Sequence, residues 1–119
     1  MEIEVATQGD ISVLTFTGKM TIDVGDLMLR EMFGELLNGG NRFFVFDLRG
    51  LTALDSAGLG EIIACHIILR ESEGSVRIVL DEPSRIGEFF SAAQLHRVFE
   101  MFADHRSAMA GFGVESTAR

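Results

Sequence analysis

The chain has 119 residues, which suits one domain with one buried core, and its 47% hydrophobic and 24% charged residues exclude wholesale disorder. Its 18 acidic against 10 basic residues give a net charge of −8, which argues against binding to nucleic-acid phosphates or to anionic lipid. No apolar run approaches the ~20 residues of a membrane-spanning helix. The acidic start is unlike a secretion signal, and the lone Cys65 cannot form an internal disulfide. We therefore expect a cytoplasmic protein with no nucleic-acid partner and no membrane insertion.

The first half of the chain predicts a hairpin, a helix and a buried strand. Residues 2–8 and 11–17 alternate apolar and polar side chains around a Gly-Asp turn, which is typical of a β-hairpin. Residues 22–37 carry apolar side chains at helical spacing, and the Gly-Gly pair that follows indicates where this helix ends. Residues 43–48 are apolar except for one aspartate, which predicts a central strand covered on both faces.

The second half predicts two further helix and strand units. After a short loop, residues 56–69 form a helix that is apolar over more than one stripe. This helix either lies deep against the sheet or has part of its surface covered by a partner or a second copy. Residues 76–80 predict the next strand, and Pro83 suits the first turn of a helix that runs to about residue 95. A short segment at 98–99 and a weak helix over 104–110 complete the fold.

Helices that alternate with strands after an opening hairpin predict an α/β fold. We expect a mixed β-sheet of four to five strands, with the hairpin at its N-terminal side, packed against about four helices. No repeat or linker interrupts the chain, so we expect one domain over residues 1–111. The Gly-, Ser- and Thr-rich end, residues 112–119, is expected to form a flexible tail.

The stretch with the most chemical information leads from the buried strand into the next helix. Asp55 is a good N-cap, because its carboxylate can accept hydrogen bonds from free backbone N–H groups. Ser56 then takes the first helical position with its hydroxyl near the surface. The small residues Ala57, Gly58 and Gly60 would let another protein approach the backbone closely. A helix start also suits a phosphate, although a plain capped helix packed on a sheet is the commoner explanation of such a pattern.

Catalytic and metal-binding interpretations lack the necessary residues. A nucleophilic Ser56 needs a base, yet His66 lies about three turns along the same helix, and His96 and His105 lie near the end of the chain. A Gly-x-Ser-x-Gly elbow and a phosphate loop ending in Lys-Ser/Thr are both missing. One cysteine and three scattered histidines show no metal-ligand spacing. We therefore expect a binding protein with no cofactor and no metal, and not an enzyme.

The segment Asp55-Ser56-Ala57-Gly58-Leu59-Gly60, preceded by Phe-Val-Phe-Asp-Leu-Arg-Gly-Leu-Thr-Ala-Leu, resembles the signature of STAS domains. More narrowly, it is similar to bacterial anti-sigma factor antagonists, also called anti-anti-sigma factors. The resemblance extends over nearly the whole chain. Residues 75–80 with Pro83 fit the family's strand and helix start, and residues 94–100 fit its closing Gly-Leu-x-x-x-Phe element, with Gln94 in place of the usual Gly. It implies a STAS-like fold.

The resemblance also implies a partner switch. An unphosphorylated antagonist binds an anti-sigma factor, often a serine-protein kinase, and so frees the sigma factor. Phosphorylation of the serine after the aspartate blocks this binding, and a phosphatase restores it. The phosphoacceptor maps onto Ser56, with Thr52 in the adjoining loop as a less favoured acceptor. The implied partner-binding residues are Thr21, Asp23, Asp55, Ser56, Ala57, Gly58 and Leu59.

Two further positions depart from the family pattern. Ala57 replaces a second Ser that many members carry, which leaves Ser56 as the only hydroxyl of the motif. Members commonly read Gly-x-Leu-Asp after the second strand, whereas Thr21 stands here in place of the acid, which bears on the identity of the partner. An alternative interpretation makes the chain a scaffold subunit of a larger signalling assembly or of a transporter complex. Monomer and homodimer both remain open.

Overall fold

The computed structural model, which describes residues 1–22 and 24–112, opens with the predicted hairpin. Strands β1 (Glu2–Gln8) and β2 (Ile11–Met20) pair antiparallel. The turn between them is tight because Gly9 has a φ of 60°, which glycine adopts without strain. Alternate side chains of β2 point to the two faces of the sheet, so this strand contributes to two buried clusters.

Three parallel strands follow β2 and complete the sheet in the order β1-β2-β3-β4-β5. They are β3 (Phe43–Leu54), β4 (Ser75–Val79) and β5 (Glu100–Phe102). Each pairs with its predecessor in parallel, so the sheet is mixed, with its one antiparallel pair in the opening hairpin. The predicted fold class is confirmed.

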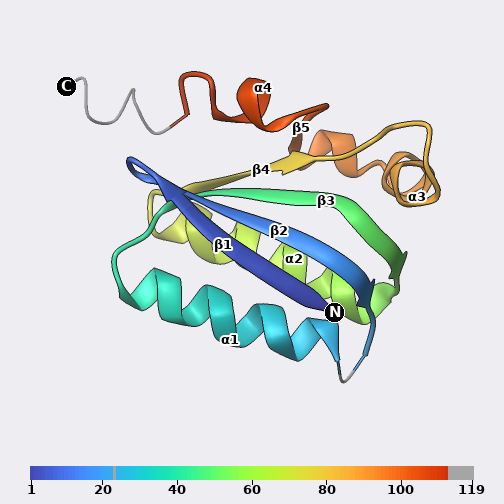
Figure 1. Cartoon of the computed structure of the whole chain (residues 1–119), viewed down its shortest axis with the longest axis horizontal. Coiled ribbons are helices and arrows are strands. Elements are labelled where there is room, and N and C mark those ends of the chain that lie inside the picture. The colour runs from blue at the N-terminus through green and yellow to red at the C-terminus, as the bar shows by residue number, and fades with distance from the viewer. Residues whose placement is uncertain (23, 113–119) are drawn as a thin grey trace.

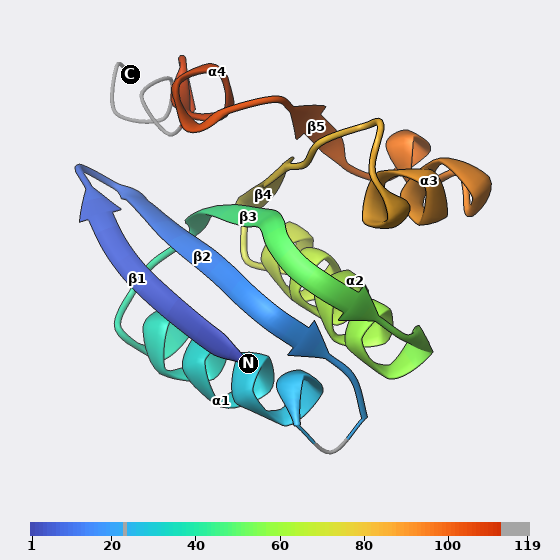
Figure 2. The same ribbon diagram turned by 45° about the vertical axis from the view of Figure 1, so that its right-hand side comes forward.

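Helices cover both faces of this sheet (Figures 1 and 2). Helix α1 (Gly25–Asn38) links β2 to β3, and α2 (Ser56–Glu71) links β3 to β4, and both lie on the same face. Helix α3 (Arg85–Ala92) and the short 3-10 helix η1 (Leu95–Arg97) connect β4 to β5. Helix α4 (His105–Met109) packs on the opposite face. Because α1 and α2 both begin where a parallel strand ends, their N-termini lie at one edge of the sheet (Figure 2).

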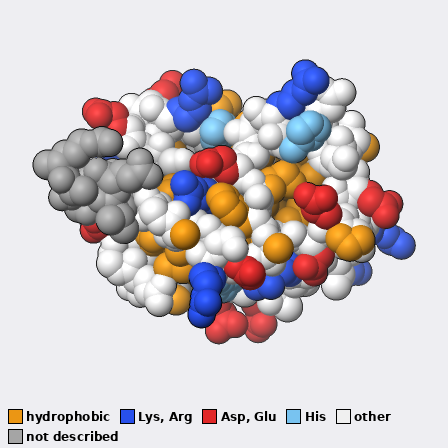
Figure 3. All heavy atoms as spheres, turned by 90° about the horizontal axis from the view of Figure 1, so that it is seen from above, with side chains coloured by type: hydrophobic (Ala, Val, Ile, Leu, Met, Phe, Trp, Pro, Cys, Tyr) orange, Lys and Arg blue, Asp and Glu red, His pale blue; other side chains and the backbone are white. Residues whose placement is uncertain are grey.

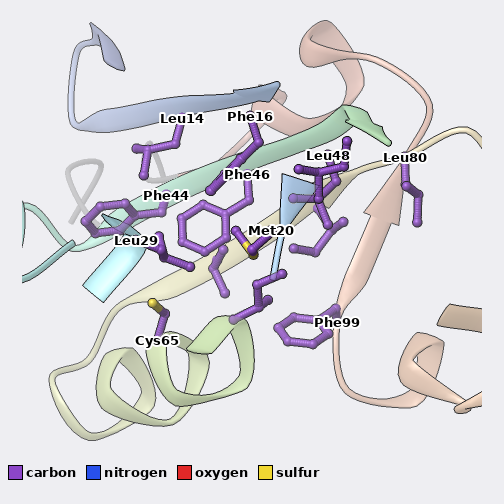
Figure 4. Packing of buried hydrophobic residues seen from close by; sticks show 14 of the residues in the cluster. Leu14, Phe16, Met20, Leu29, Phe44, Phe46, Leu48, Cys65, Leu80 and Phe99 are labelled. Carbon is purple, nitrogen blue, oxygen red and sulfur yellow. The ribbon is translucent and has the colours of Figure 1, made fainter. Parts of the chain in front are cut away.

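The main core lies between the sheet and the helices α1 and α2 (Figure 4). Phe16 and Phe46 meet edge to face, with ring centroids 5.4 Å apart, and Phe44 packs beside them. A fully buried side chain of this size stabilises the fold by roughly 2–3 kcal/mol. Val45 points to the other face, into a second cluster closed by α4 and Phe112. The strand over 43–48 is thus covered on both faces, as predicted.

Several boundaries differ from those predicted. β3 continues to Leu54, where a loop after residue 48 was expected, because β2 keeps pairing with it as far as Met20 opposite Leu54. Pro83 precedes the helix instead of entering its first turn, since the hydroxyl of Ser84 caps α3 by accepting from the Gly87 N–H at 3.0 Å. The short segment expected at 98–99 lies between η1 and β5, and strand β5 follows it at Glu100–Phe102.

The end of the chain also differs in one respect. Phe112, expected to begin a flexible tail, is buried against Phe43, with ring centroids 5.5 Å apart. The remaining tail residues, 113–119, lie outside the described residues. Over the part of the chain that is described, no helix is both long and apolar enough to cross a membrane.

Candidate functional site

Asp55 fixes the start of α2 to the end of β2. Its Oδ1 accepts a hydrogen bond from the Gly58 N–H at 3.0 Å, and its Oδ2 accepts one from the Ile22 N–H at 2.9 Å. The Asp55 N–H in turn donates to the Met20 carbonyl at 3.3 Å. The bonds from Gly58 and Ile22 hold the pKa of the Asp55 carboxyl below its usual range, because they favour the charged form. The predicted N-cap is thus present, and it also reaches across to the turn before α1.

Ser56 occupies the first position of α2, and it is exposed. Its place follows from the cap, because Asp55 is extended (φ −109°, ψ −177°) and the helical conformation begins at the next residue. The side chain therefore stands at the surface of the end where the chain enters α2. Another molecule can reach the Ser56 side chain without local unfolding.

The small residues after Ser56 do not all serve as bare surface. Gly58 is buried, and a Cβ there would lie 2.4 Å from the Met20 carbonyl oxygen, so its missing side chain is required by packing within the chain. Gly60 is exposed, with open space where a Cβ would stand. Ala57 and Leu59 are half-buried, and Leu59 packs against the main core. Bare backbone is thus offered at Gly60, whereas the expectation for Gly58 is corrected.

The remaining predicted site residues lie at different distances from this helix start. Thr21 is half-buried in the turn before α1, where its carbonyl oxygen accepts from the Val24 N–H at 3.2 Å and from the Gly25 N–H at 3.1 Å. Its neighbour Ile22 bonds to Asp55, so this turn adjoins the start of α2. Thr52 is exposed, but it belongs to strand β3 and not to a loop. Asp23 lies outside the described residues.

An exposed apolar surface next to Ser56 was missed by the sequence analysis. It consists of four side chains, here called the apolar shoulder, and their exposed fractions are Ile22 62%, Val24 51%, Leu27 42% and Met28 36%. They sit in the turn tied to Asp55 and in the first turn of α1. The available signal was the excess of apolar residues at this helix start over those that its buried face needs. Large contiguous apolar patches mark protein interaction sites, so these side chains are candidates for such a site.

The three histidines lie elsewhere. His66 packs on Phe99, with ring centroids 5.0 Å apart, and burial lowers its pKa. His105 Nε2 lies 2.6 Å from Asp47 Oδ2 on the face covered by α4. In the described chain, no hydrogen bond joins any histidine to Ser56, and no group of three His, Cys, Asp or Glu side chains could hold a metal.

Cys65 offers no reactive thiol. It is buried in the main core, and burial raises its pKa to about 12, so the thiolate is not available at neutral pH. Near Ser56 the described chain therefore offers an exposed serine beside exposed apolar side chains, and none of the described histidines is hydrogen-bonded to it.

Comparison with known proteins identifies the family and the fold. A family model described as the STAS domain matches residues 2–108, and no curated protein sequence matches the chain. Among solved structures, an anti-sigma factor antagonist from Mycobacterium paratuberculosis is similar, with a TM-score of 0.80, 20% identity, and 92% of each chain covered.

Two structures of SpoIIAA are also similar. The anti-sigma factor antagonist SpoIIAA in its unphosphorylated form has a TM-score of 0.65, with 15% identity over 89% of this chain and 92% of that chain. The Bacillus cell fate determinant SpoIIAA in the phosphorylated form has a TM-score of 0.69, with 14% identity over 89% and 96%. Identities this low show a shared fold. The STAS family model matches most of the length of this chain, and the chain therefore belongs to the STAS domain family.

Proposed function

We propose that this protein is an anti-sigma factor antagonist that binds an anti-sigma factor with serine-kinase activity and is released when Ser56 is phosphorylated. The observation that carries the proposal is the exposed Ser56 at the start of α2, beside the apolar shoulder. The names of the structural neighbours support the same role, and one of them has been solved in both an unphosphorylated and a phosphorylated form.

A partner would bind mainly by covering the exposed apolar side chains that lie near the uncharged Ser56 hydroxyl. Ile22 and Val24 are more than half exposed, so a partner that covers them gains stabilisation of roughly 25 cal/mol per Å² of apolar surface removed from water. Gly60 lets the partner approach one turn further along α2. The half-buried Thr21 and Asp55 would border this surface, and their fixed backbone would keep it in one shape.

Phosphorylation would reverse this balance without changing the fold. A phosphate adds roughly 1.5 to 2 negative charges and three oxygens at the start of α2. The free chain tolerates them, because the helix dipole favours an anion at this end and water solvates it. A docked partner would have to bury them next to the Asp55 carboxylate. A penalty of about 2–4 kcal/mol at the interface lowers affinity roughly 30- to 700-fold.

The test compares Ser56→Ala, Ser56→Asp and wild type. The Ser56→Ala chain is immobilised to capture the partner, the captured protein is identified by mass spectrometry, and binding is then titrated with and without ATP. We expect Ser56→Ala to stay bound in ATP, wild type to be released with phosphate on Ser56, and Ser56→Asp to bind at least about 30-fold more weakly.

Thr52→Ala serves as the matched control, because Thr52 is an exposed hydroxyl close by in sequence but on strand β3. It should behave as wild type and still be phosphorylated at Ser56. Equal affinity of Ser56→Ala and Ser56→Asp would refute the switch. A large complex that is stable in ATP would instead favour the scaffold interpretation.

A further inference from the structure

A groove lies beside strand β5, between this strand, helix α3 and the segment that follows β4, and none of its lining residues belongs to α2. Two adjoining hollows form it, with volumes of about 770 Å³ and 260 Å³, and they share Glu82, Met101 and Phe102 in their walls. The larger hollow is bounded by α3 on one side and by Phe99, two residues after η1, on another. Figure 3 shows the face that carries α3 and β5, with hydrophobic side chains at the bottom of a hollow and acidic side chains near it.

β5 is the last strand of the described sheet, so its second edge pairs with no other strand. β5 pairs with β4 on one side, and the Leu80 N–H donates to the Phe102 carbonyl at 3.0 Å. In a parallel ladder the N–H and C=O of alternate residues face the same neighbour, so those of Met101 face away from β4. Met101 lines both hollows. An extended segment laid beside β5 would pair with Met101 as an added strand does.

The charge of the groove is one-sided. Asp81, Glu82, Glu88 and Glu100 line the two hollows, and among the described residues no lysine or arginine does. Glu100 meets Arg77 at 3.4 Å from outside the groove. Glu82 and Glu88 form no ion pair within the described chain, so their negative charges are uncompensated. A cationic side chain therefore finds complementary charge here, over an apolar floor of Phe99, Met101 and Phe102.

We propose that this groove binds an extended, basic segment of another protein, which adds a short strand to β5 and places lysine or arginine side chains against Glu82 and Glu88. Backbone pairing with Met101 sets the register, alternate apolar side chains rest on the floor, and the cations point to the acidic wall. The groove shares no residue with the Ser56 site, so it would be a second interaction surface that serves whether or not Ser56 carries a phosphate.

The test uses the full chain, labelled with ¹⁵N, and two blocked peptides followed by NMR titration. Acetyl-Val-Lys-Val-Lys-Val-amide is the probe, and acetyl-Val-Glu-Val-Glu-Val-amide is its control. We expect the lysine peptide to bind with sub-millimolar affinity and to shift the amide signals of Met101 and its neighbours, and the glutamate peptide not to bind. Binding should weaken as salt is raised, because the acidic side chains are at the surface.

Substitutions in the groove and elsewhere show where on the protein the lysine peptide binds. Glu82→Lys with Glu88→Lys should weaken the lysine peptide at least about tenfold, and the milder Glu82→Gln with Glu88→Gln should weaken it in the same direction while keeping side-chain shape. Glu31→Lys with Glu35→Lys makes the same change in net charge on exposed positions of α1 and should leave affinity within about twofold. Ser56→Asp should also leave it unchanged, which separates this proposal from the switch.

Three results would each overturn the proposal. One is the absence of binding by the lysine peptide at millimolar concentration. Another is equal binding by the glutamate peptide, since that would remove charge as the determinant. The third is equal weakening by the α1 control variant, since that would trace binding to the overall charge of −8 and not to the groove.

Discussion

At the scale of single residues, the two glycines after Ser56 have opposite structural roles. Alanine at position 58 would bring its Cβ to 2.4 Å from the Met20 carbonyl oxygen and 3.0 Å from Leu54 Cδ1. Backbone must then move, so we expect Gly58→Ala to lower the free energy of unfolding by about 1–3 kcal/mol. Gly60→Ala meets open space within a helix and should raise it by up to about 1 kcal/mol. Urea denaturation of both variants checks the pair. A stabilised Gly58→Ala would contradict this account of the helix start.

The same comparison shows how far the sequence could predict the site. Asp55 as N-cap and Ser56 as the first helical residue follow from local preferences, and both are where the pattern predicted them. The sequence left open whether Gly58 serves packing or the approach of a partner, because Met20, the neighbour that decides this, lies 38 positions away in the chain. The apolar shoulder was missed for a related reason. Only the packed structure separates apolar residues that face the core from those that face solvent.

At the scale of elements, periodicity predicts a strand only where its register is regular. β1, the first part of β2 and residues 43–48 were recognised because their alternation or apolar run is unbroken. The continuation of β3 to Leu54 was not, because the β2–β3 pairing shifts register twice, between Thr15 and Thr17 and between Gly18 and Lys19. After each shift, the side chains that pointed into the core and those that pointed outward exchange places relative to the paired strand. The short β5 was not predicted as a strand, because three residues carry too little periodicity to define one.

Helix α4 is held to the sheet by a polar cluster around Asp47. Asp47 Oδ2 accepts a hydrogen bond from Arg49 Nη2 at 2.8 Å. The same oxygen lies 2.6 Å from Nε2 of His105, which is the first residue of α4. Burial opposes ionisation of Asp47, but the hydrogen bonds from Arg49 and His105 outweigh it and lower the pKa of the carboxyl. These polar contacts help to hold α4 over the second buried apolar cluster.

Asp47→Asn should therefore change how stability depends on pH. A carboxyl whose pKa is lowered by folding stabilises the protein above its unfolded pKa, near 4, and this stabilisation is lost as pH falls through the folded value. We expect the variant to lose about 1.5–3 kcal/mol at pH 7 and to show a flatter decline below about pH 4. Unfolding in urea from pH 2 to pH 7 measures both effects. Asp10→Asn, in the exposed hairpin turn, is the control. The prediction would be contradicted if the free energy of unfolding of Asp47→Asn fell below about pH 4 as steeply as that of wild type.

At the scale of the whole molecule, the two proposed interaction surfaces lie on separate parts of the fold. Ser56 and the apolar shoulder belong to the layer of α1 and α2, and the acidic groove belongs to β5 and α3. The net charge of −8 could be read from the sequence, but its concentration beside a free strand edge could not, because Glu82, Glu88 and Glu100 converge only after β5 joins the sheet. Composition predicts whether a chain is charged, and topology decides where that charge can be used.

If phosphorylation acts only by masking a binding surface, a negative charge at Ser56 must leave the stability of the fold unchanged. The side chain is exposed at the first position of α2, where an added negative charge is favoured by the helix dipole and opposed by the neighbouring Asp55. We therefore expect the free energies of unfolding of Ser56→Ala, Ser56→Asp and wild type to agree within about 0.5 kcal/mol, as for other exposed substitutions. Urea unfolding measured on the same preparations used for partner binding makes the comparison direct. If Ser56→Asp were destabilised by more than about 2 kcal/mol, its loss of binding would reflect unfolding near α2, and the masking mechanism would have to be abandoned even though binding had changed as predicted.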